Sequence, residues 1–208
     1  ISNEIFNFIN NIIDKEKDNE KTYNTLLEIG YSIFEIGCLN VFWSALYAEL
    51  FRDLIKNFKI MEKVCHENLK KFIKIFDVID CVKLTNDNYS EFCNCNKKNE
   101  NRRGMSSYFV NLMIKEIIPK NYIYNVIRNL LDKINSNSSD EEFINTNEEI
   151  MENVSIILTK GKDELKKEEK EWEGIVRTIE FYSEQNGEKG ISKKLQFKCL
   201  DIIDELEE

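Results

Sequence analysis

Apolar residues recur along this chain at the spacing of one helix face, and this single kind of element repeats from end to end. In the first part of the chain, a charged stretch interrupts the stripes at residues 15–21, and a second interruption falls at residues 57–60. We predict two antiparallel helical hairpins that turn there. The apolar positions expected in their core are Ile5, Phe8, Ile9, Ile12, Ile13, Tyr23, Leu26, Leu27, Gly30, Ile33, Phe34, Leu46, Tyr47, Leu50, Phe51, Leu54, Ile55, Met61, Val64, Cys65, Leu69, Phe72, Phe76 and Ile79.

The middle of the chain begins with a break in this pattern. Residues 85–101 are polar, rich in asparagine and without a period, so we predict a loop or insertion there. The helical spacing resumes at Met105 and continues on both sides of Pro119, the only proline. Proline fits the first turn of a helix, where its missing N–H costs nothing. We therefore predict a third hairpin that turns at residues 115–120.

Capping signals organise the last part of the chain. Thr146 and Glu149 have the spacing of a capping box, which predicts a helix start, and that helix is expected to end at Gly161. The following helix is expected to stop at the glycine-containing turn 187–190. Ser192 then caps a final helix. The buried face of that final helix is predicted to be Leu195, Cys199, Ile202, Ile203 and Leu206.

Helix pairs therefore open near residues 3, 43, 103 and 147. Steps of about 40 to 47 residues are typical of HEAT repeats, in which each pair buries one face on its neighbours. We expect an all-α solenoid of about five HEAT-type antiparallel helix pairs; the pattern alone equally allows an irregular helical bundle. The expected single domain, 1–208, comprises repeat 1 (about 3–37), repeat 2 (43–80), an insertion (84–101), repeat 3 (102–134), repeat 4 (146–184) and the first helix of repeat 5 (191–206).

Composition narrows the class of protein. The chain has 208 residues, of which 42% are hydrophobic and 11% aromatic, enough to bury a core. Seven glycines and one proline are too few for the turns of an all-β or Rossmann fold. We find no run of about 20 apolar residues and expect no membrane partner. Six cysteines without regular spacing indicate reduced thiols and a cytoplasmic protein.

Four blocks carry a resemblance to a known family. Phe34-Glu35 with residues 43–51, WSALYAELF, resembles the "IFE … F-S-x-L-Y-A-x-L" block of the middle domain of eukaryotic translation initiation factor 4G. Three further blocks look like blocks of that domain in the same order, over nearly the whole chain. They are residues 102–115 (RRGM, then FVNLMIK), 148–163 (ending LTKGKD) and 191–204 (ISKKLQF, then LDIID). The chain departs from the family pattern at Ser106, Ser107, Asn111, Ile114 and Lys193.

The resemblance implies a translation-initiation scaffold that binds and stimulates a DEAD-box RNA helicase of the initiation factor 4A type. In a HEAT stack the hairpin turns line up along one edge, which is the expected contact surface, and acidic residues there suit a basic partner. A cap-binding protein would be bound only through segments outside this chain. The candidate helicase-binding residues are Phe58, Lys59, Lys115, Glu116, Ile118, Asp18 and Asp163.

Enzymatic chemistry has little support in the sequence. The single histidine, His66, belongs to a helical stripe, and no nucleophilic triad can be assembled around it. Cys93 and Cys95 with Cys81 and His66 are a candidate zinc-binding set, but C-x-C is not the usual C-x₂₋₄-C spacing. No glycine-rich phosphate loop is present. We therefore expect no catalytic residue, no metal and no cofactor.

RNA is the second partner class. Lysines on one helical face and a basic pair beside the polar stretch are candidate phosphate contacts, although a net charge of −9 repels a polyanion at long range. Two alternatives stay open: a related middle-domain scaffold in mRNA decay, splicing or cap or poly(A) binding, and an RNA-binding module without a helicase. The candidate RNA-binding residues are Lys63, Lys70, Lys74, Arg102 and Arg103.

Overall fold

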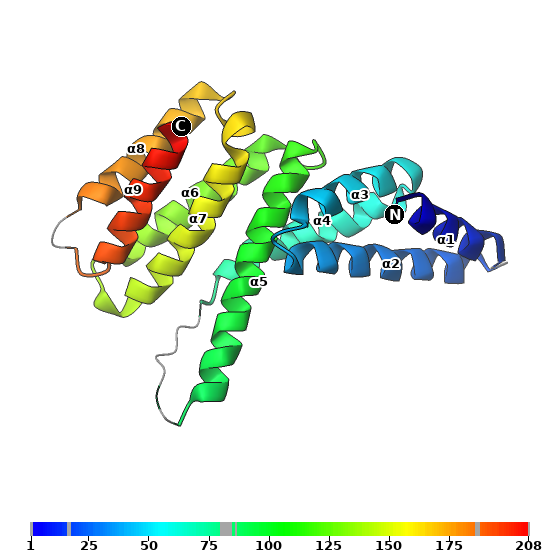
Figure 1. Cartoon of the computed structure of the whole chain (residues 1–208), viewed down its shortest axis with the longest axis horizontal. Helices are drawn as coiled ribbons and strands as arrows, with labels where there is room; N and C mark the ends of the chain where they lie inside the picture. The colour runs from blue at the N-terminus through cyan, green and yellow to red at the C-terminus, as the bar shows by residue number, and fades with distance from the viewer. Residues whose placement is uncertain (1, 16–17, 80–84, 86, 186–187, 208) are drawn as a thin grey trace.

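A computed structural model of the chain describes residues 2–15, 18–79, 85, 87–185 and 188–207. Its regular elements are all helical, with no β-strand among the described residues, which confirms the predicted all-α class (Figure 1). No described helix is both long and apolar enough to cross a bilayer. The elements are α1 (Ser2–Lys15), α2 (Asn19–Leu39), α3 (Ser44–Asn57), α4 (Ile60–Phe72), the 3-10 segment η1 (Ile73–Phe76), α5 (Tyr89–Ile114), α6 (Lys120–Asn137), η2 (Glu141–Phe143), α7 (Ile144–Leu165), α8 (Glu169–Glu184) and α9 (Lys193–Glu207).

The helices pack side by side along an elongated molecule (Figure 1). Helices α1 to α4 form one end, α8 and α9 form the other, and the long helix α5 lies between them. Helix α5 packs against α2 and α3 on one side and against α7 on the other. Helix α7 in turn packs against α6 and α9, and α8 packs against α9. The two ends of the molecule are therefore joined chiefly through α5.

An aromatic cluster fastens the first four helices to α5. The ring of Phe34 meets Phe51 and Tyr108 edge-on, with centroids 5.2 and 5.0 Å apart. Phe72 stacks on Phe109 with centroids 4.1 Å apart and an interplanar angle of 3°. All five side chains are almost completely buried. Truncating one buried Phe to Ala typically costs about 3–5 kcal/mol, so this junction carries a large share of the stability.

The predicted loop at residues 85–101 is wrong, because most of it forms the first half of α5. Phe92, Cys95, Asn99 and Arg102 recur at helical spacing, and these four are buried or half-buried while most of the residues between them are exposed. A face this narrow and this polar gives no apolar period, so the sequence pattern misses it. This half of α5 projects beyond the neighbouring helices (Figure 1).

Arg102 explains why this polar helix stays attached to the fold. Its side chain is only 5% exposed. The Nε group donates to the carbonyl of Ile75 at 3.0 Å, and Nη2 donates to the carbonyl of Val78 at 3.4 Å, while Nη1 donates to Asn99 Oδ1. Glu149 Oε1 lies 4.0 Å away and supplies the opposite charge. The guanidinium thus holds the chain around η1 against α5.

The predicted start of α7 at a Thr146 capping box is also wrong. Asp140 accepts a hydrogen bond from the backbone N–H of Glu142 at 2.9 Å and initiates the 3-10 segment η2. This segment runs directly into α7 at Ile144, two residues before the predicted cap. The real initiating signal is therefore an aspartate further upstream.

The predicted end of α7 at Gly161 is wrong as well. Helix α7 continues to Leu165, and the turn lies at residues 166–168. A Cβ atom at Gly161 would lie 2.8 Å from Val110 Cγ2 of α5 and 2.9 Å from Leu165 Cδ1. The glycine therefore allows close packing of two helices, and does not end one.

Other boundaries follow the prediction. Turns occur within 57–60 and 115–120 as expected, and α1 ends and α2 begins within 15–21, of which 16–17 lie outside the described residues. Ser192 precedes α9, and its Oγ accepts the backbone N–H of Leu195 at 3.1 Å, as predicted for a cap. Helix α8 ends at Glu184, shortly before the predicted glycine turn.

Most predicted core positions are buried or half-buried, with three exceptions. Phe8, Tyr23 and Leu46 are 61%, 44% and 51% exposed. Phe8 and Tyr23 belong to α1 and α2 at the end of the molecule, where no further described helix covers them (Figure 1). Leu46 lies on the outer face of α3. Periodicity identifies a helix face, but it does not tell which part of that face a neighbour covers.

Candidate interaction edge at the helix turns

Three of the helix turns lie along the same side of the molecule. The α3–α4, α5–α6 and α7–α8 turns follow the upper side of Figure 1, whereas the α6–α7 and α8–α9 connections lie on the lower side. The candidate residues Phe58, Lys59, Lys115 and Glu116 belong to the first two of these turns. We call this side of the molecule the turn edge.

The α5–α6 turn ends helix α5 by a backbone motif. The N–H of Glu116 donates to the carbonyl of Met113, and the N–H of Ile117 donates to the carbonyl of Leu112, both at 2.9 Å. This is the Schellman arrangement, which usually has glycine at the position of Glu116. Glu116 has a φ of 60°, the only positive value among described non-glycine residues. An L-residue in this region costs about 1–2 kcal/mol, so the turn carries an exposed carboxylate at an energetic cost.

Lys115 is tied to α3. Its Nζ lies 3.2 Å from Glu49 Oε2, and the two side chains are 26% and 49% exposed. Glu49 also faces Arg52, whose Nη2 lies 3.7 Å from Oε1. Exposed pairs of this kind contribute about 0–1 kcal/mol. A partner's carboxylate or carbonyl therefore competes for Lys115 at little cost.

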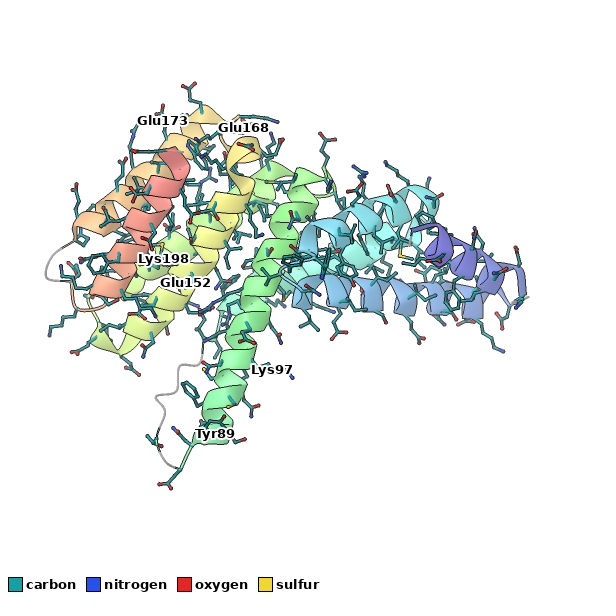
Figure 2. All side chains as sticks on the ribbon, in the orientation of Figure 1. Tyr89, Lys97, Glu152, Glu168, Glu173 and Lys198 are labelled. Atoms are coloured by element: carbon teal, nitrogen blue, oxygen red, sulfur yellow. The ribbon has the colours of Figure 1, made fainter. Side chains whose placement is uncertain are left out.

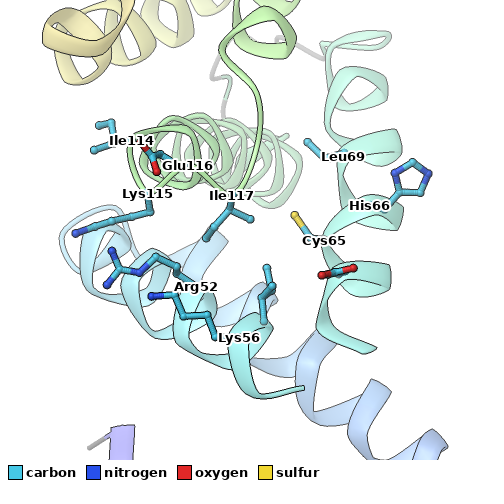
Figure 3. Close-up of a pocket in the computed structure, with 11 residues that line it drawn as sticks. Arg52, Lys56, Cys65, His66, Leu69, Ile114, Lys115, Glu116 and Ile117 are labelled. Carbon is cyan, nitrogen blue, oxygen red and sulfur yellow. The ribbon is translucent and has the colours of Figure 1, made fainter. Parts of the chain in front are cut away.

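A groove of about 750 Å³ opens between α3, α4 and the end of α5 (Figure 3). Charged side chains of both signs line it together with apolar residues. Burial raises the pKa of the Cys65 thiol to about 12, so this cysteine is not a thiolate nucleophile at neutral pH. The groove is suited to binding rather than to catalysis. Its lining residues are Arg52, Ile55, Lys56, Glu62, Cys65, His66, Leu69, Ile114, Lys115, Glu116 and Ile117.

Arg52 presents a buried donor in this groove. Its Nε is buried and has no hydrogen-bond partner in the described part of the chain. Asp53 Oδ1 lies 3.6 Å from this Nε, beyond hydrogen-bond range, and the same oxygen lies 3.8 Å from Lys56 Nζ. A buried donor without a partner costs about 1–3 kcal/mol. An acceptor brought in by a ligand at this point would recover part of that cost.

Three further candidates, Phe58, Lys59 and Ile118, differ in accessibility. Phe58 is half-buried and packs against Phe6, with ring centroids 6.3 Å apart, while Lys59 beside it is exposed. Ile118 is 3% exposed and belongs to the core. The proposed direct contact by Ile118 is therefore corrected: after the tight turn at Glu116 its side chain points into the fold, where it anchors the start of α6.

The two acidic candidates, Asp18 and Asp163, lie at opposite ends of their helices. Asp18 caps α2, since its Oδ1 accepts the backbone N–H groups of Glu20 at 2.9 Å and Lys21 at 3.3 Å. This carboxylate is engaged in helix initiation, although it remains exposed. Asp163 is exposed in the last turn of α7, not in a loop as predicted.

The candidate RNA-binding residues do not form one basic patch. Arg102 is buried, which corrects its assignment as a surface contact. The Nε of Arg103 donates to Glu149 Oε1 at 3.1 Å, and the Nζ of Lys63 donates to Tyr23 Oη at 3.1 Å. Only Lys70 and Lys74 among the five are exposed and have no such bond in the described residues.

Acidic partners also neutralise nearby lysines on the face of α7 and α9. The Nζ of Lys194 lies 2.8 Å from Glu148 Oε2. The Nζ of Lys198 lies 3.1 Å from Glu152 Oε2 (Figure 2). Figure 2 also shows Lys97 on the projecting half of α5, away from the Lys198–Glu152 pair. Paired cations attract phosphates weakly, so this face does not offer a strong polyanion site.

The considered zinc site is not assembled in the described part of the chain. No group of three or more His, Cys, Asp or Glu side chains there is arranged to hold a metal. Cys93 is exposed and Cys95 is buried, because residues two apart on α5 point to different faces. Cys81 lies outside the described residues.

The charged residues on the α3 side of the groove were not among the site residues predicted from the sequence. Glu49, Arg52, Asp53 and Lys56 recur at helical spacing on the face of α3 that is polar in sequence, and all four take part in the ion pairs described above. The signal was present in the i, i+3 and i, i+4 pattern of charges. What the sequence did not show is that Lys115, more than 50 residues further on, completes the row.

No protein-family model matches the sequence, and no curated protein matches it either. The functional interpretation therefore depends on the geometry of the turn edge and on the residue blocks that resemble the initiation factor 4G middle domain.

Proposed function

We propose that this chain is a scaffold of HEAT-type helix pairs that binds and stimulates a DEAD-box RNA helicase of the initiation factor 4A type. The packing of alternate helices supports the solenoid: α3 packs on α5, α5 on α7 and α7 on α9, while α2 packs on α4 and α6 on α8. Two rows of helices in this order are typical of stacked helical hairpins.

The observation that carries the proposal is the turn edge itself. Three turns lie on one side of an elongated, stiff stack, and the groove beside two of them presents Lys56, Glu62, Lys115 and Glu116 around an apolar floor. A row of turns spaced along a rod offers separated contact points to a partner built of two lobes. Charged contacts at such a rim set specificity and association rate more than affinity.

The proposed mechanism needs no catalytic residue in the chain. A scaffold that contacts both lobes of a mobile helicase binds one arrangement of the lobes better than the others, and it shifts the population by that difference in affinity. If the favoured arrangement is the productive one, the helicase's ATPase rate rises. The shift is limited by the strength of the lobe contacts, so weakening one turn should reduce stimulation before it abolishes binding.

The test is a pull-down with a purified helicase of this type, followed by its ATPase assay with and without the chain. Lys59→Glu combined with Glu116→Lys reverses two exposed charges at the turn edge. We expect at least a tenfold loss of helicase affinity and a corresponding loss of stimulation. The matched control is Lys70→Glu, an exposed charge reversal on the body of α4. Wild-type chain that neither binds nor stimulates the helicase would refute the proposal.

Charge reversals on α4 and η1 test the RNA-binding alternative. A chain that binds single-stranded RNA at physiological salt, loses that binding with Lys70→Glu and Lys74→Glu, and ignores the helicase would be an RNA-binding module. The ion pairs of Arg103, Lys194 and Lys198 with acidic residues favour the helicase proposal over this one.

A further inference from the structure

The corner between α2 and α3 exposes a group of large apolar side chains. Phe42 is 82% exposed, and Trp43 and Leu46 are each 51% exposed. The rings of Phe42 and Trp43 meet edge-on, with centroids 4.8 Å apart. Single exposed apolar residues are ordinary, but a run of them on one corner is not. The apolar corner, as we call it, consists of Ile36, Leu39, Val41, Phe42, Trp43 and Leu46.

Side-chain hydrogen bonds make this corner rigid. Asn40 Oδ1 accepts the backbone N–H of Trp43 at 3.2 Å, and the Oγ of Ser44 donates to the carbonyl of Val41 at 3.0 Å. The amide of Asn111 on α5 donates to the same Ser44 Oγ at 2.7 Å. The exposed rings therefore sit on a fixed turn and not on a loose loop. A surface that is already ordered binds a partner at a lower entropic cost.

Close backbone packing fixes the corner to the centre of the molecule. A Cβ atom at Gly104 of α5 would lie only 2.1 Å from the carbonyl oxygen of Cys38. A Cβ atom at Gly37 of α2 would lie 2.7 Å from the ring of Tyr108. The end of α2 is thus pressed onto α5, which fixes the position from which the apolar corner begins.

The apolar corner is large enough to be a binding surface. An aromatic side chain offers about 150–250 Å² to a contact, and two of the six residues are aromatic. Together the six expose apolar area on the order of the 300–600 Å² that marks the largest patch of a typical monomer. Patches of that size on soluble proteins mark sites of interaction.

Charge around the apolar corner selects the kind of partner. Glu35 and Glu28 are exposed on α2 about one and three helical turns before Leu39, and neither forms an ion pair among the described residues. A second copy of this chain would bring the same carboxylates and a net charge of −9 to the contact, so self-association is disfavoured. A segment with apolar anchors and flanking Lys or Arg residues satisfies both features.

We propose that the apolar corner binds a basic amphipathic helix of another protein, with its apolar stripe on Phe42, Trp43 and Leu46 and its cations toward Glu28 and Glu35. This surface is separate from the turn edge: α3 contributes its first turn to the corner and its last turns to the groove. The proposal is independent of helicase binding, and a chain that fails to bind a helicase can still satisfy it.

The experiment uses a synthetic helical peptide of about five turns with leucines on one face and lysines on the other. A twin peptide with glutamates in place of the lysines is the control ligand. Binding is followed by tryptophan emission, because Trp43 is exposed whereas the other tryptophan, Trp172, is only 9% exposed. We expect the leucine–lysine peptide to shift Trp43 emission to the blue at physiological salt, and the twin to leave it unchanged.

Two variants and a control locate the site. Phe42→Ser with Leu46→Ser removes the anchors, and Glu28→Lys with Glu35→Lys reverses the charge; each should weaken peptide binding at least tenfold without loss of helical circular dichroism. Phe197→Ser removes an exposed aromatic residue of α9 and should leave binding unchanged. Equal binding by all three variants, equal binding of the twin, or dimers of the wild-type chain that the Phe42→Ser, Leu46→Ser variant abolishes would overturn the proposal.

Discussion

The apolar corner and the α5–α6 turn both reverse the chain, and they are stabilised in opposite ways. The apolar corner is held by side chains, chiefly Ser44 and Asn111, and by a backbone contact at Gly104. The α5–α6 turn is held by two backbone hydrogen bonds and has Glu116 in a left-handed conformation. The first leaves apolar groups exposed and the second leaves charges exposed. At each turn, the side chains that take no part in stabilising the turn are therefore the ones that remain exposed.

The largest expected effect comes from adding a side chain at Gly104, where α5 touches the backbone of α2 under the apolar corner. Gly104→Ala places a methyl group 2.1 Å from the Cys38 carbonyl oxygen, so α2 must move away from α5. We expect a loss of about 3 kcal/mol in the free energy of unfolding, measured by urea denaturation. Gly174→Ala is the control, since nothing lies within 4 Å of its Cβ position, and it should stabilise by about 0.5–1 kcal/mol. A Gly104→Ala variant as stable as wild type would contradict the close packing.

A smaller effect is expected from removing the polar link between the apolar corner and α5. Asn111→Ala deletes the donor to Ser44 Oγ at 2.7 Å and to the Ser107 carbonyl at 2.9 Å. Because this site is buried, we expect a loss of about 1–3 kcal/mol by the same measurement. Asn125→Ala, on the exposed face of α6, is the control and should stay within about 0.5 kcal/mol of wild type. Equal stability of the two variants would show that the hydrogen bonds contribute nothing.

The α5–α6 turn should respond in the opposite direction. Glu116→Gly relieves the positive φ, and after the entropy of glycine in the unfolded chain is subtracted we expect a gain of about 0.5–1 kcal/mol. Glu116→Ala keeps the strained conformation and removes only the carboxylate, so its stability should equal that of wild type. The result that counts against this interpretation is a Glu116→Gly variant less stable than Glu116→Ala.

The smallest effect concerns two buried thiols, one beside each region. Burial raises the pKa of Cys38, under the apolar corner, and of Cys65, in the groove wall, from 9.0 to about 12. A raised folded pKa contributes stability that is complete below pH 9 and is lost as pH rises from 9 toward 12. At pH 9 we expect each thiol to cost a few tenths of a kcal/mol. Cys38→Ala with Cys65→Ala should flatten this dependence between pH 8 and 10.

Labelling gives an independent check on these thiols. At neutral pH a thiol reagent should modify the exposed Cys93 rapidly and reach Cys38 and Cys65 only after unfolding, as read by mass spectrometry of the digested chain. Rapid modification of Cys65 in the folded chain would mean that the groove wall around this thiol opens in solution.

The helical class and most of the turns were predictable because apolar spacing fixes which residues are buried together. Turns at 57–60 and 115–120 follow from interrupted stripes, and the cap at Ser192 follows from a local hydrogen bond. The first half of α5 was not predictable in this way, because its attachment depends on Arg102 and on carbonyl groups of a segment more than 20 residues earlier. Local spacing carries no information on such a contact.

The candidate site residues were predicted correctly where local spacing decides their position and incorrectly where tertiary contacts do. Lys59 and Glu116 were correctly expected at exposed turns, since turn position follows from the helix boundaries. Ile118 and Arg102 were misplaced, because burial at a helix start or behind a polar helix depends on the tertiary neighbours. Leu46 was assigned to the core and is exposed for the same reason, and no prediction was made for Phe42 and Trp43 beside it. An apolar residue in a helical stripe is taken as core until the structure shows that no helix covers it.

Helix α5 has 26 residues and so extends about 39 Å, and it touches both ends of the molecule. A partner that pulls on α1 to α4 while another holds α7 to α9 loads this one rod across its width, at the stacked rings of Phe72 and Phe109 on one flank and at Gly161 on the other. The packing on both flanks of α5, together with the hydrogen bonds from Tyr122 and Lys133 of α6 to the carbonyls of Leu69 and Phe76, therefore sets how far the two arms can be spread by an applied force.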